Sequence, residues 1–206
     1  MDFDANRKGY FSLNVQAVCD PDLKIVDVVV RWPGSTHDAT IFEYSYIKTR
    51  MEQNDFNNGL LLGDSGYGVK SYILTPLLNP IITAAEHRYN QSHIRTRNII
   101  ERMFGVWKRR FPVLSLGLKL EIEVIQDVIV ATTVLHNIAR AENEELPEDE
   151  IGIEDVGDIP QPDPVQHRGT DNAVRQALID DYFSSKDDNR YGHVPLNLIL
   201  KNTPIH

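Results

Sequence analysis

The chain has 206 residues, of which 41% are hydrophobic and 25% are charged, and its formal net charge is −9. This size and composition indicate one globular domain with appendages, and they exclude fibrous and fully disordered classes. No apolar run in the sequence reaches transmembrane length, and no signal-peptide stretch opens it, so we expect no membrane partner. The single cysteine, Cys19, excludes an internal disulfide and fits the cytosol or the nucleus.

The negative charge is concentrated in one segment. Residues 141–164 contain ten acids and neither Lys nor Arg, so removing them from the total of −9 leaves +1 for the other residues. This acidic, proline-containing composition predicts a disordered linker over 142–168. A nearly neutral body does not exclude a nucleic-acid partner, because the local charge decides binding.

The sequence patterns of the first half of the chain predict the order strand, strand, helix, strand. Two β-rich segments, 10–19 and 24–31, flank the turn "DPDL", which predicts a hairpin. Residues 36–53 have apolar side chains at helical spacing, and the apolar run Leu60–Leu62 predicts a buried strand. Residues 69–91 contain two prolines and predict an irregular segment.

The second half is helical. A helix with an apolar stripe and a basic remainder is expected from Ser92 to Pro112, and a second helix over 121–144 is apolar enough to be largely buried. A short helix is predicted within 169–186, and 187–206 is expected to be a tail. The order of elements predicts an α/β fold in which helices flank a mixed sheet, and the sequence has no glycine-rich phosphate loop.

Three acids are candidates for chemistry. Asp64, in "GLLLGDSGY", follows the Leu60–Leu62 strand, where open α/β sheets tend to place their sites. Asp38 is expected one turn into the helix that follows "WPGS", and Glu101 lies in the basic helix. Carboxylates are natural ligands of Mg²⁺ and Mn²⁺, so two or three of them together could hold ions for phosphodiester chemistry.

Each acid also has a structural interpretation. Asp64 could cap the segment after its strand, and Asp38 closes a capping-box pattern in "STHD". Glu101 could form an ion pair with Arg97 one turn earlier. His136 and Asn137, on the second long helix, could be catalytic or could be satisfied core groups.

The basic helix could bind a phosphate backbone. Seven Lys or Arg residues and two acids lie between Glu86 and Phe111. Such a stripe suits phosphate contacts, and it is also typical of a solvated cationic helix face.

Several stretches together resemble one family. They are "NRKGYFSLNVQAVCD", "VVVRWPGSTHDATIF", "GLLLGDSGY", "RYNQSHIRTRNIIERMFGVWKRRFPVL" and "VIVATTVLHNIA". In this order they resemble the DDE superfamily endonuclease domain of PIF/Harbinger transposases and of Harbinger-derived nuclease-like proteins. The likeness covers residues 6 to about 140 and implies an endonuclease domain over 6–141.

The resemblance implies an RNase H-like fold with a centre for Mg²⁺ or Mn²⁺. Asp64 matches the family's second catalytic Asp, Glu101 matches its catalytic Glu, and Asp38 matches an additional acid read as a metal ligand. Arg97, Lys108 and Arg109 would then hold the DNA backbone.

The sequence departs from the family in one respect. The family's first catalytic Asp lies in a strand upstream of "NRKG", and no similar motif occurs here. Asp2, Asp4 and Asp20 are the nearest acids, and none is a convincing substitute. The resemblance therefore predicts a sheet whose first strand is missing and which exposes an edge.

Two functions remain open from the sequence. One is a nuclear, metal-dependent DNA endonuclease domain of a Harbinger-type transposase or a domesticated derivative, which would work by a two-metal mechanism. The other is a catalytically inactive remnant that binds DNA or protein. For either function the resemblance suggests a Myb-like DNA-binding protein as a partner.

Overall fold

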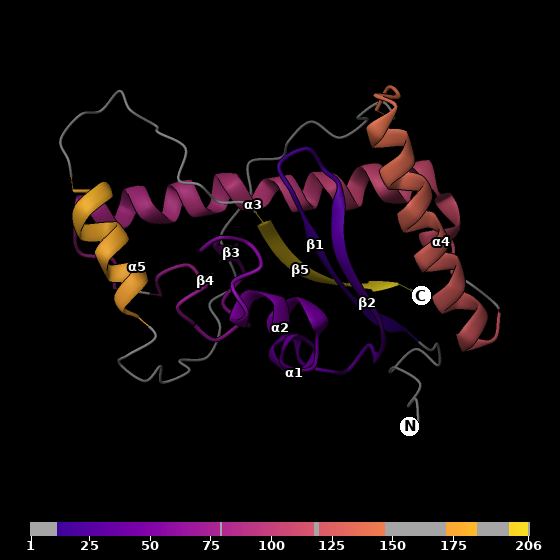
Figure 1. The fold of residues 1–206 in the computed structure, drawn as a ribbon, viewed down its shortest axis with the longest axis horizontal. Coiled ribbons are helices and arrows are strands. Elements are labelled where there is room, and N and C mark those ends of the chain that lie inside the picture. Colours follow the sequence, from indigo (N-terminus) through magenta and orange to yellow (C-terminus); the bar gives the residue numbers. More distant parts are fainter. Residues whose placement is uncertain (1–11, 79, 118–119, 147–171, 185–197, 206) are drawn as a thin grey trace.

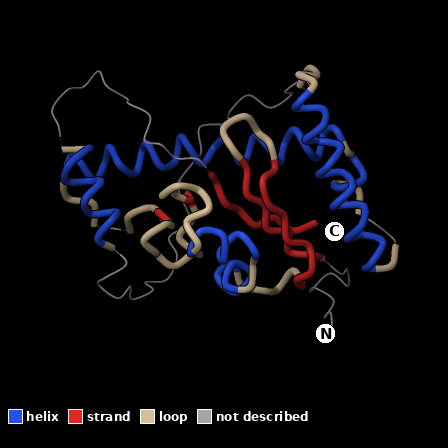
Figure 2. The backbone as a smooth tube through the Cα atoms, in the orientation of Figure 1, coloured by secondary structure: helices blue, strands red, loops and turns tan. Residues whose placement is uncertain are grey.

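A mixed five-stranded sheet organises the protein, as Figures 1 and 2 show. The computed structural model describes residues 12–78, 80–117, 120–146, 172–184 and 198–205. The strand order across the sheet is β2-β1-β5-β3-β4. The described strands and helices form the predicted α/β fold with a mixed sheet flanked by helices, an arrangement compatible with an RNase H-like fold.

The predicted hairpin forms the first two strands. Strands β1 (Leu13–Cys19) and β2 (Ile25–Pro33) pair antiparallel, and every residue of β1 is buried. In the turn between them, Asp20 Oδ1 accepts hydrogen bonds from the backbone N–H groups of Asp22 and Lys24. Asp20 therefore stabilises the turn.

The strand at Leu60–Leu62 is also present in a shorter form. It is β3 (Leu61–Leu62), which pairs in parallel with β4 (Ile73–Leu74). Strand β4 lies within the stretch predicted to be irregular. Its two residues are too few to produce a periodic pattern, so only the pairing with β3 identifies it.

The largest correction concerns the predicted tail at 187–206. Residues Leu198–Ile205 form strand β5, which lies between β1 and β3 near the middle of the sheet. It pairs antiparallel with β1 from Leu13–Ile205 to Cys19–Ile199, and in parallel with β3. The expected exposed edge beside β1 is therefore wrong, since β2 and β5 cover both sides of that strand.

The helix predicted over 36–53 is two helices. Helix α1 spans Asp38–Glu43 and helix α2 spans Tyr46–Glu52. Ser45 interrupts the run because its hydroxyl accepts a bond from the backbone N–H of Lys48 and so caps α2. The "STHD" capping box does not form, because His37 is the N-cap of α1 and makes no side-chain capping bond.

The basic helix begins earlier than predicted. Helix α3 spans Ala84–Arg110, and Thr83 with Glu86 forms a capping box at its start. The prediction from Ser92 missed two turns because His87, Arg88 and Asn90 obscure the apolar period there. Pro112 begins a short 3-10 turn (Pro112–Leu114) directly after the helix.

Helix α4 (Ile122–Ala141) is less buried than predicted. Its buried side includes Ile125, Ile129 and His136, whereas its other side exposes Val124, Val130, Val134, Leu135 and Ile138. Its length and mean hydropathy of 1.3 would also suffice for a membrane span, contrary to the sequence expectation, but core helices of soluble proteins meet that criterion too. The Asn137 side chain bonds the backbone N–H and carbonyl of Ile25, and His136 Nε2 lies 2.8 Å from the carbonyl oxygen of Leu23. The buried Nδ1 of His136 has no hydrogen-bond partner among the described residues.

Near the C-terminus, α5 (Ala173–Ala177) continues into a π-helical turn (Leu178–Tyr182), both within the range predicted to contain a short helix. Ile179 and Phe183 pack against Ala85 and Tyr89 of α3. The linker predicted over 142–168 lies mostly outside the described residues. The π-helical turn packs on α3 and β5 pairs with β1 and β3, so elements on both sides of the predicted boundary at 141 contact one another.

The core has two layers, one on each face of the sheet. One cluster joins β1 to α3 and α4 through Val15, Ile100, Trp107 and Ile129. The other joins Val18 and Leu200 to α1 and α2 through Phe42 and Ile47. Figure 1 shows the same division, with α3 and α4 on the side of the sheet opposite α1 and α2.

A buried histidine links α3 to the sheet and makes stability depend on pH. The ring Nε2 of His93 lies 3.2 Å from the carbonyl oxygen of Leu74, and burial lowers the pKa of His93 from 6.5 to about 4. The unfolded chain therefore binds a proton more readily below pH 6.5, so the free energy of unfolding falls as pH drops towards 4. We expect a loss of about 3 kcal/mol from this group, measured by urea unfolding across that range.

The matched variants are His93→Gln and His87→Gln, because His87 is exposed on the same helix. His93→Gln should flatten the pH dependence between 6.5 and 4, and His87→Gln should leave it unchanged. Equal slopes in all three proteins would contradict this account.

Candidate functional site

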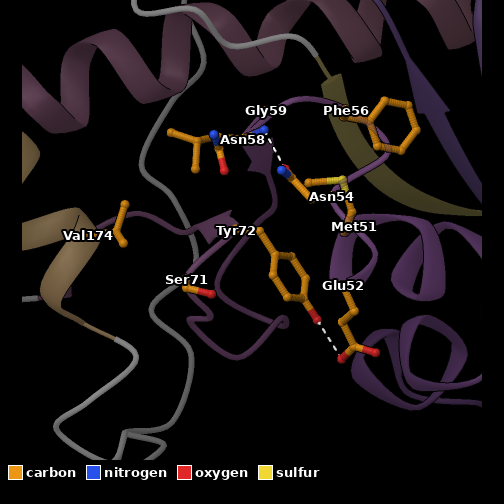
Figure 3. Close-up of a pocket in the computed structure, with 10 residues that line it drawn as sticks. Met51, Glu52, Asn54, Phe56, Asn58, Gly59, Ser71, Tyr72 and Val174 are labelled. Carbon is orange, nitrogen blue, oxygen red and sulfur yellow. Dashed lines mark hydrogen bonds between the residues drawn. The ribbon is translucent and has the colours of Figure 1, made fainter.

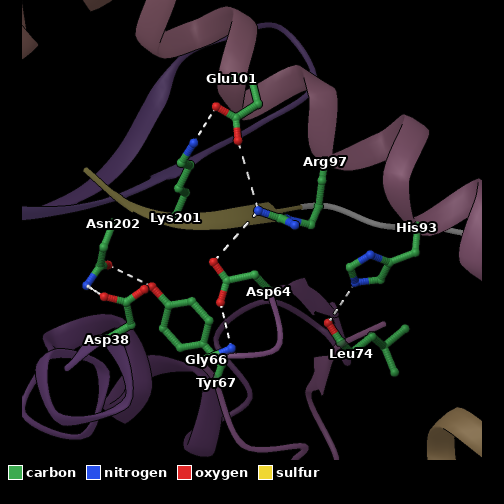
Figure 4. Close-up of polar contacts among 10 residues, drawn as sticks. All are labelled: Asp38, Asp64, Gly66, Tyr67, Leu74, His93, Arg97, Glu101, Lys201 and Asn202. Atoms are coloured by element: carbon green, nitrogen blue, oxygen red, sulfur yellow. Dashed lines mark hydrogen bonds and ion pairs between the residues drawn. The ribbon is translucent and has the colours of Figure 1, made fainter. Parts of the chain in front are cut away.

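Asp64 lies at the carboxyl end of β3, where the strand turns sharply. Its Oδ1 accepts a 2.9 Å hydrogen bond from the backbone N–H of Gly66, which fixes the carboxylate in the turn. A Cβ on Gly63 would lie 2.8 Å from the buried ring of Tyr67, so glycine is required for this close approach. The turn bond agrees with the capping interpretation and does not exclude the functional one, because Oδ2 points away from the turn towards Arg97 (Figure 4).

Asp38 faces Asp64 across Gly66. A Cβ added to Gly66 would lie 3.0 Å from Asp64 Oδ1 and 3.7 Å from Asp38 Oδ2, so the two carboxylates border one small space. Burial raises the pKa of the Asp38 carboxyl, and the nearby charge of Asp64 raises it further. These two acids are therefore brought together by the fold, from the ends of β3 and α1.

Two amides hold Asp38 in place. Asn14 of β1 and Asn202 of β5 both donate to Asp38 Oδ1, at 3.3 Å and 3.0 Å. These bonds act against the rise in the pKa of Asp38. The side chain of Asn202 also accepts a 2.7 Å bond from the hydroxyl of buried Tyr67. Asp38 is thus oriented by a polar network that includes residues of the two adjacent strands β1 and β5 (Figure 4).

Among the described residues, Glu101 is linked to another acid, Asp64, through the cationic side chain of Arg97. It lies on α3, where Lys201 of β5 forms an ion pair and a hydrogen bond with its Oε2. One guanidinium nitrogen of Arg97 lies 4.0 Å from Glu101 Oε1 and 3.8 Å from Asp64 Oδ2. The predicted Arg97–Glu101 ion pair is therefore present, and it extends to Asp64.

The other two predicted DNA-binding residues lie further along α3. Lys108 is near Lys201 and Glu101, and burial, with the positive charge of Lys201 next, lowers the pKa of Lys108. The guanidinium of Arg109 lies against Gly105, since a Cβ there would be 3.4 Å from its Nη1. No contact with DNA tests these roles, so they stay predictions.

Sequence reasoning missed three residues of this site. Asn14, Lys201 and Asn202 are ordinary polar residues in the sequence, and two of them fall in the segment predicted to be a tail. The available signal was the apolar run Leu198–Leu200 just before "KNTPI", which matches a short buried strand. Asp2 and Asp4 lie outside the described residues.

The two facing carboxylates match the oxygen ligands that a divalent cation prefers. Asp38 and Asp64 supply hard oxygen ligands on the two sides of the small space at Gly66, and this fits Mg²⁺ or Mn²⁺. Within the described ranges, no group of three or more His, Cys, Asp or Glu side chains is placed to hold one ion. Glu101 fits such a centre only when Lys201 and Arg97 release its carboxylate.

A separate pocket lies at the other end of β3. Its cavity of about 620 Å³ is lined by Met51, Phe56, Gly59, Tyr72 and Val174, among others (Figure 3). Gly59 and Leu60 precede β3, whereas Asp64 follows it. None of the three acids lines this pocket.

Acids from α1 and from the carboxyl end of β3 thus lie beside a basic helix in a protein of the α/β class. The comparison with known families agrees with this class. The family model described as DDE superfamily endonuclease matches residues 2–137, and the chain belongs to this family.

The resemblance to Harbinger-derived nuclease-like proteins is confirmed by curated relatives. The chain is similar to "Putative nuclease HARBI1" of Mus musculus (40% identity) and of Homo sapiens (38%), each over 65% of this chain and 39% of the relative. It is also similar to "Protein ALP1-like" of Arabidopsis thaliana, with 25% identity over 62% of this chain and 35% of the relative. The chain thus spans about two fifths of the length of these relatives. No solved structure matches.

Proposed function

We propose that this chain is the divalent-metal-dependent DNA endonuclease domain of a Harbinger-type transposase or a domesticated derivative. The observation that carries the proposal is the pair of carboxylates, Asp38 and Asp64, which face each other beyond the carboxyl end of β3. The chain that carries them belongs to an endonuclease family. Their mutual repulsion contributes to the raised pKa of Asp38, and a cation between them would relieve it.

In this proposal the reaction is hydrolysis of a phosphodiester. Water attacks phosphorus, one P–O ester bond breaks, and the leaving oxygen takes a proton. A divalent cation held by Asp38 and Asp64 would lower the pKa of the attacking water and polarise the phosphate. The amides of Asn14 and Asn202 keep Asp38 oriented for that ligand role.

The cationic residues of α3 would bind the DNA backbone. Arg97 and Lys108 lie on the side of α3 that carries Glu101, so a phosphate near the acids would meet both. Arg109 would contact a neighbouring phosphate. DNA, a Myb-like partner protein and a nuclear location belong to the same proposal, and they rest on the family resemblance alone.

The test is nicking of supercoiled plasmid by the folded chain in Mn²⁺. We expect nicked circles in Mn²⁺, none in excess chelator, and none with Glu101→Gln. Glu123→Gln is the matched control, because Glu123 is exposed on α4. Absence of nicking by folded protein would contradict the proposal and favour the inactive binding module, whose acids are neutralised by Arg97 and Lys201.

A further inference from the structure

Strand β5 brings a lysine into the acidic site. The pairing of β3 with β5 ends at Leu62–Ile199, so Asp64 and Lys201 lie two residues beyond the same pair on neighbouring parallel strands. The side chain of Lys201 leaves the sheet on the side of α3 and reaches Glu101 (Figure 4). The ammonium of Lys201 thus lies among the acids, near the carboxyl end of β3.

The acids divide into two groups with different partners. Asp38 and Asp64 face each other across Gly66, and Asp64 has the guanidinium of Arg97 3.8 Å from its Oδ2. Glu101 instead has the ammonium of Lys201 on Oε2 and the guanidinium of Arg97 near Oε1. Arg97 is therefore shared between Asp64 and Glu101, whereas the ammonium of Lys201 pairs with Glu101.

We propose that the centre holds one divalent cation, between Asp38 and Asp64, and that the ammonium of Lys201 takes the place of a second ion beside Glu101. This inference rests on the proposed function and specifies its metal stoichiometry. Lys201 supplies a fixed positive charge near the scissile phosphate, where a two-metal centre would use its second ion. It also makes Glu101 a partner of Lys201 rather than a metal ligand.

The pairing of β5 fixes the position of Lys201 beside Glu101. The strand pairs on both sides, and its neighbouring residues Leu200 and Asn202 are buried. The backbone of Lys201 is therefore fixed, and only its side chain can move. The side chain of Lys201 is 24% exposed, against 47% for Glu101, so the pair lies partly out of water. A partly buried pair is harder for a dissolved ion to displace than an exposed one.

The experiment measures Mn²⁺ stoichiometry directly, by calorimetric titration or by electron paramagnetic resonance of free Mn²⁺. The variant is Lys201→Met, which keeps the length of the side chain and removes its charge. The matched control is Lys70→Met, because Lys70 is also partly exposed and pairs with Glu43, which is not one of the three acids. Far-ultraviolet circular dichroism establishes that each protein is folded.

We expect one Mn²⁺ for the unaltered chain and for Lys70→Met, and two for Lys201→Met. Adding Glu101→Gln to Lys201→Met should restore one, and Asp38→Asn in the unaltered chain should abolish binding. Two ions in the unaltered chain, or one ion in folded Lys201→Met, would overturn the inference and leave the metal-dependent function standing. No ion in either protein would overturn the proposed metal-dependent function as well.

Discussion

Replacement of Asp64 by Asn should abolish plasmid nicking while the protein stays folded. The amide oxygen can still accept the bond from the Gly66 N–H that orders the turn, so the local structure has a reason to persist. The amide carries no negative charge, however, and is a poor substitute for a carboxylate ligand of Mg²⁺ or Mn²⁺. We expect the nicking rate to fall by at least about 100-fold. Loss of a residue that only supports a metal ligand already lowers activity by up to about 100-fold.

The control for this prediction is Asp55→Asn. Asp55 is an exposed carboxylate that pairs with Arg50 on α2, and it does not belong to the site. The Asp55→Asn protein should nick plasmid at the same rate as the unaltered chain. If Asp64→Asn also retained that rate, any observed nicking would have to come from other residues, and the assignment of Asp64 would be wrong.

Leu200→Ala should lower the free energy of unfolding by about 2–5 kcal/mol. Leu200 is fully buried in β5, between β1 and β3, and packs in the cluster that contains Phe42 and Ile47. The substitution removes three carbon atoms from a filled core and leaves a cavity, whose cost depends on how far the neighbours relax. Urea unfolding followed by circular dichroism measures the change.

Leu116→Ala is the matched control, because the same atoms are removed from a leucine that is 81% exposed. It should change stability by no more than about 0.5 kcal/mol. A similarly small effect of Leu200→Ala would mean that residues 198–205 behave as the tail predicted from the sequence. The strand assignment, and with it the position of Lys201, would then be wrong.

The two residues that hold Asp38 illustrate how far sequence reasoning reached into the site. The family motifs identified Asp38, Asp64 and Glu101 because each lies in a distinctive local pattern. Asn14 and Asn202 carry no such pattern, and they become partners of Asp38 only through the pairing of β1 with β5. The same holds for Lys201, which reaches Glu101 from one hundred residues further along the chain.

The sequence by itself determined the elements whose signals are local. The hairpin follows from two β-rich runs around a turn, and α3 and α4 follow from long apolar stripes. The α/β class and the family motifs could also be recognised from the sequence alone. Tertiary structure alone decided the strand order, the role of β5 and the neutralisation of Glu101 by Lys201 and Arg97. The physical reason is that strand pairing and ion pairing join residues far apart in sequence, and a short apolar run becomes a strand only when neighbouring strands supply its hydrogen-bond partners.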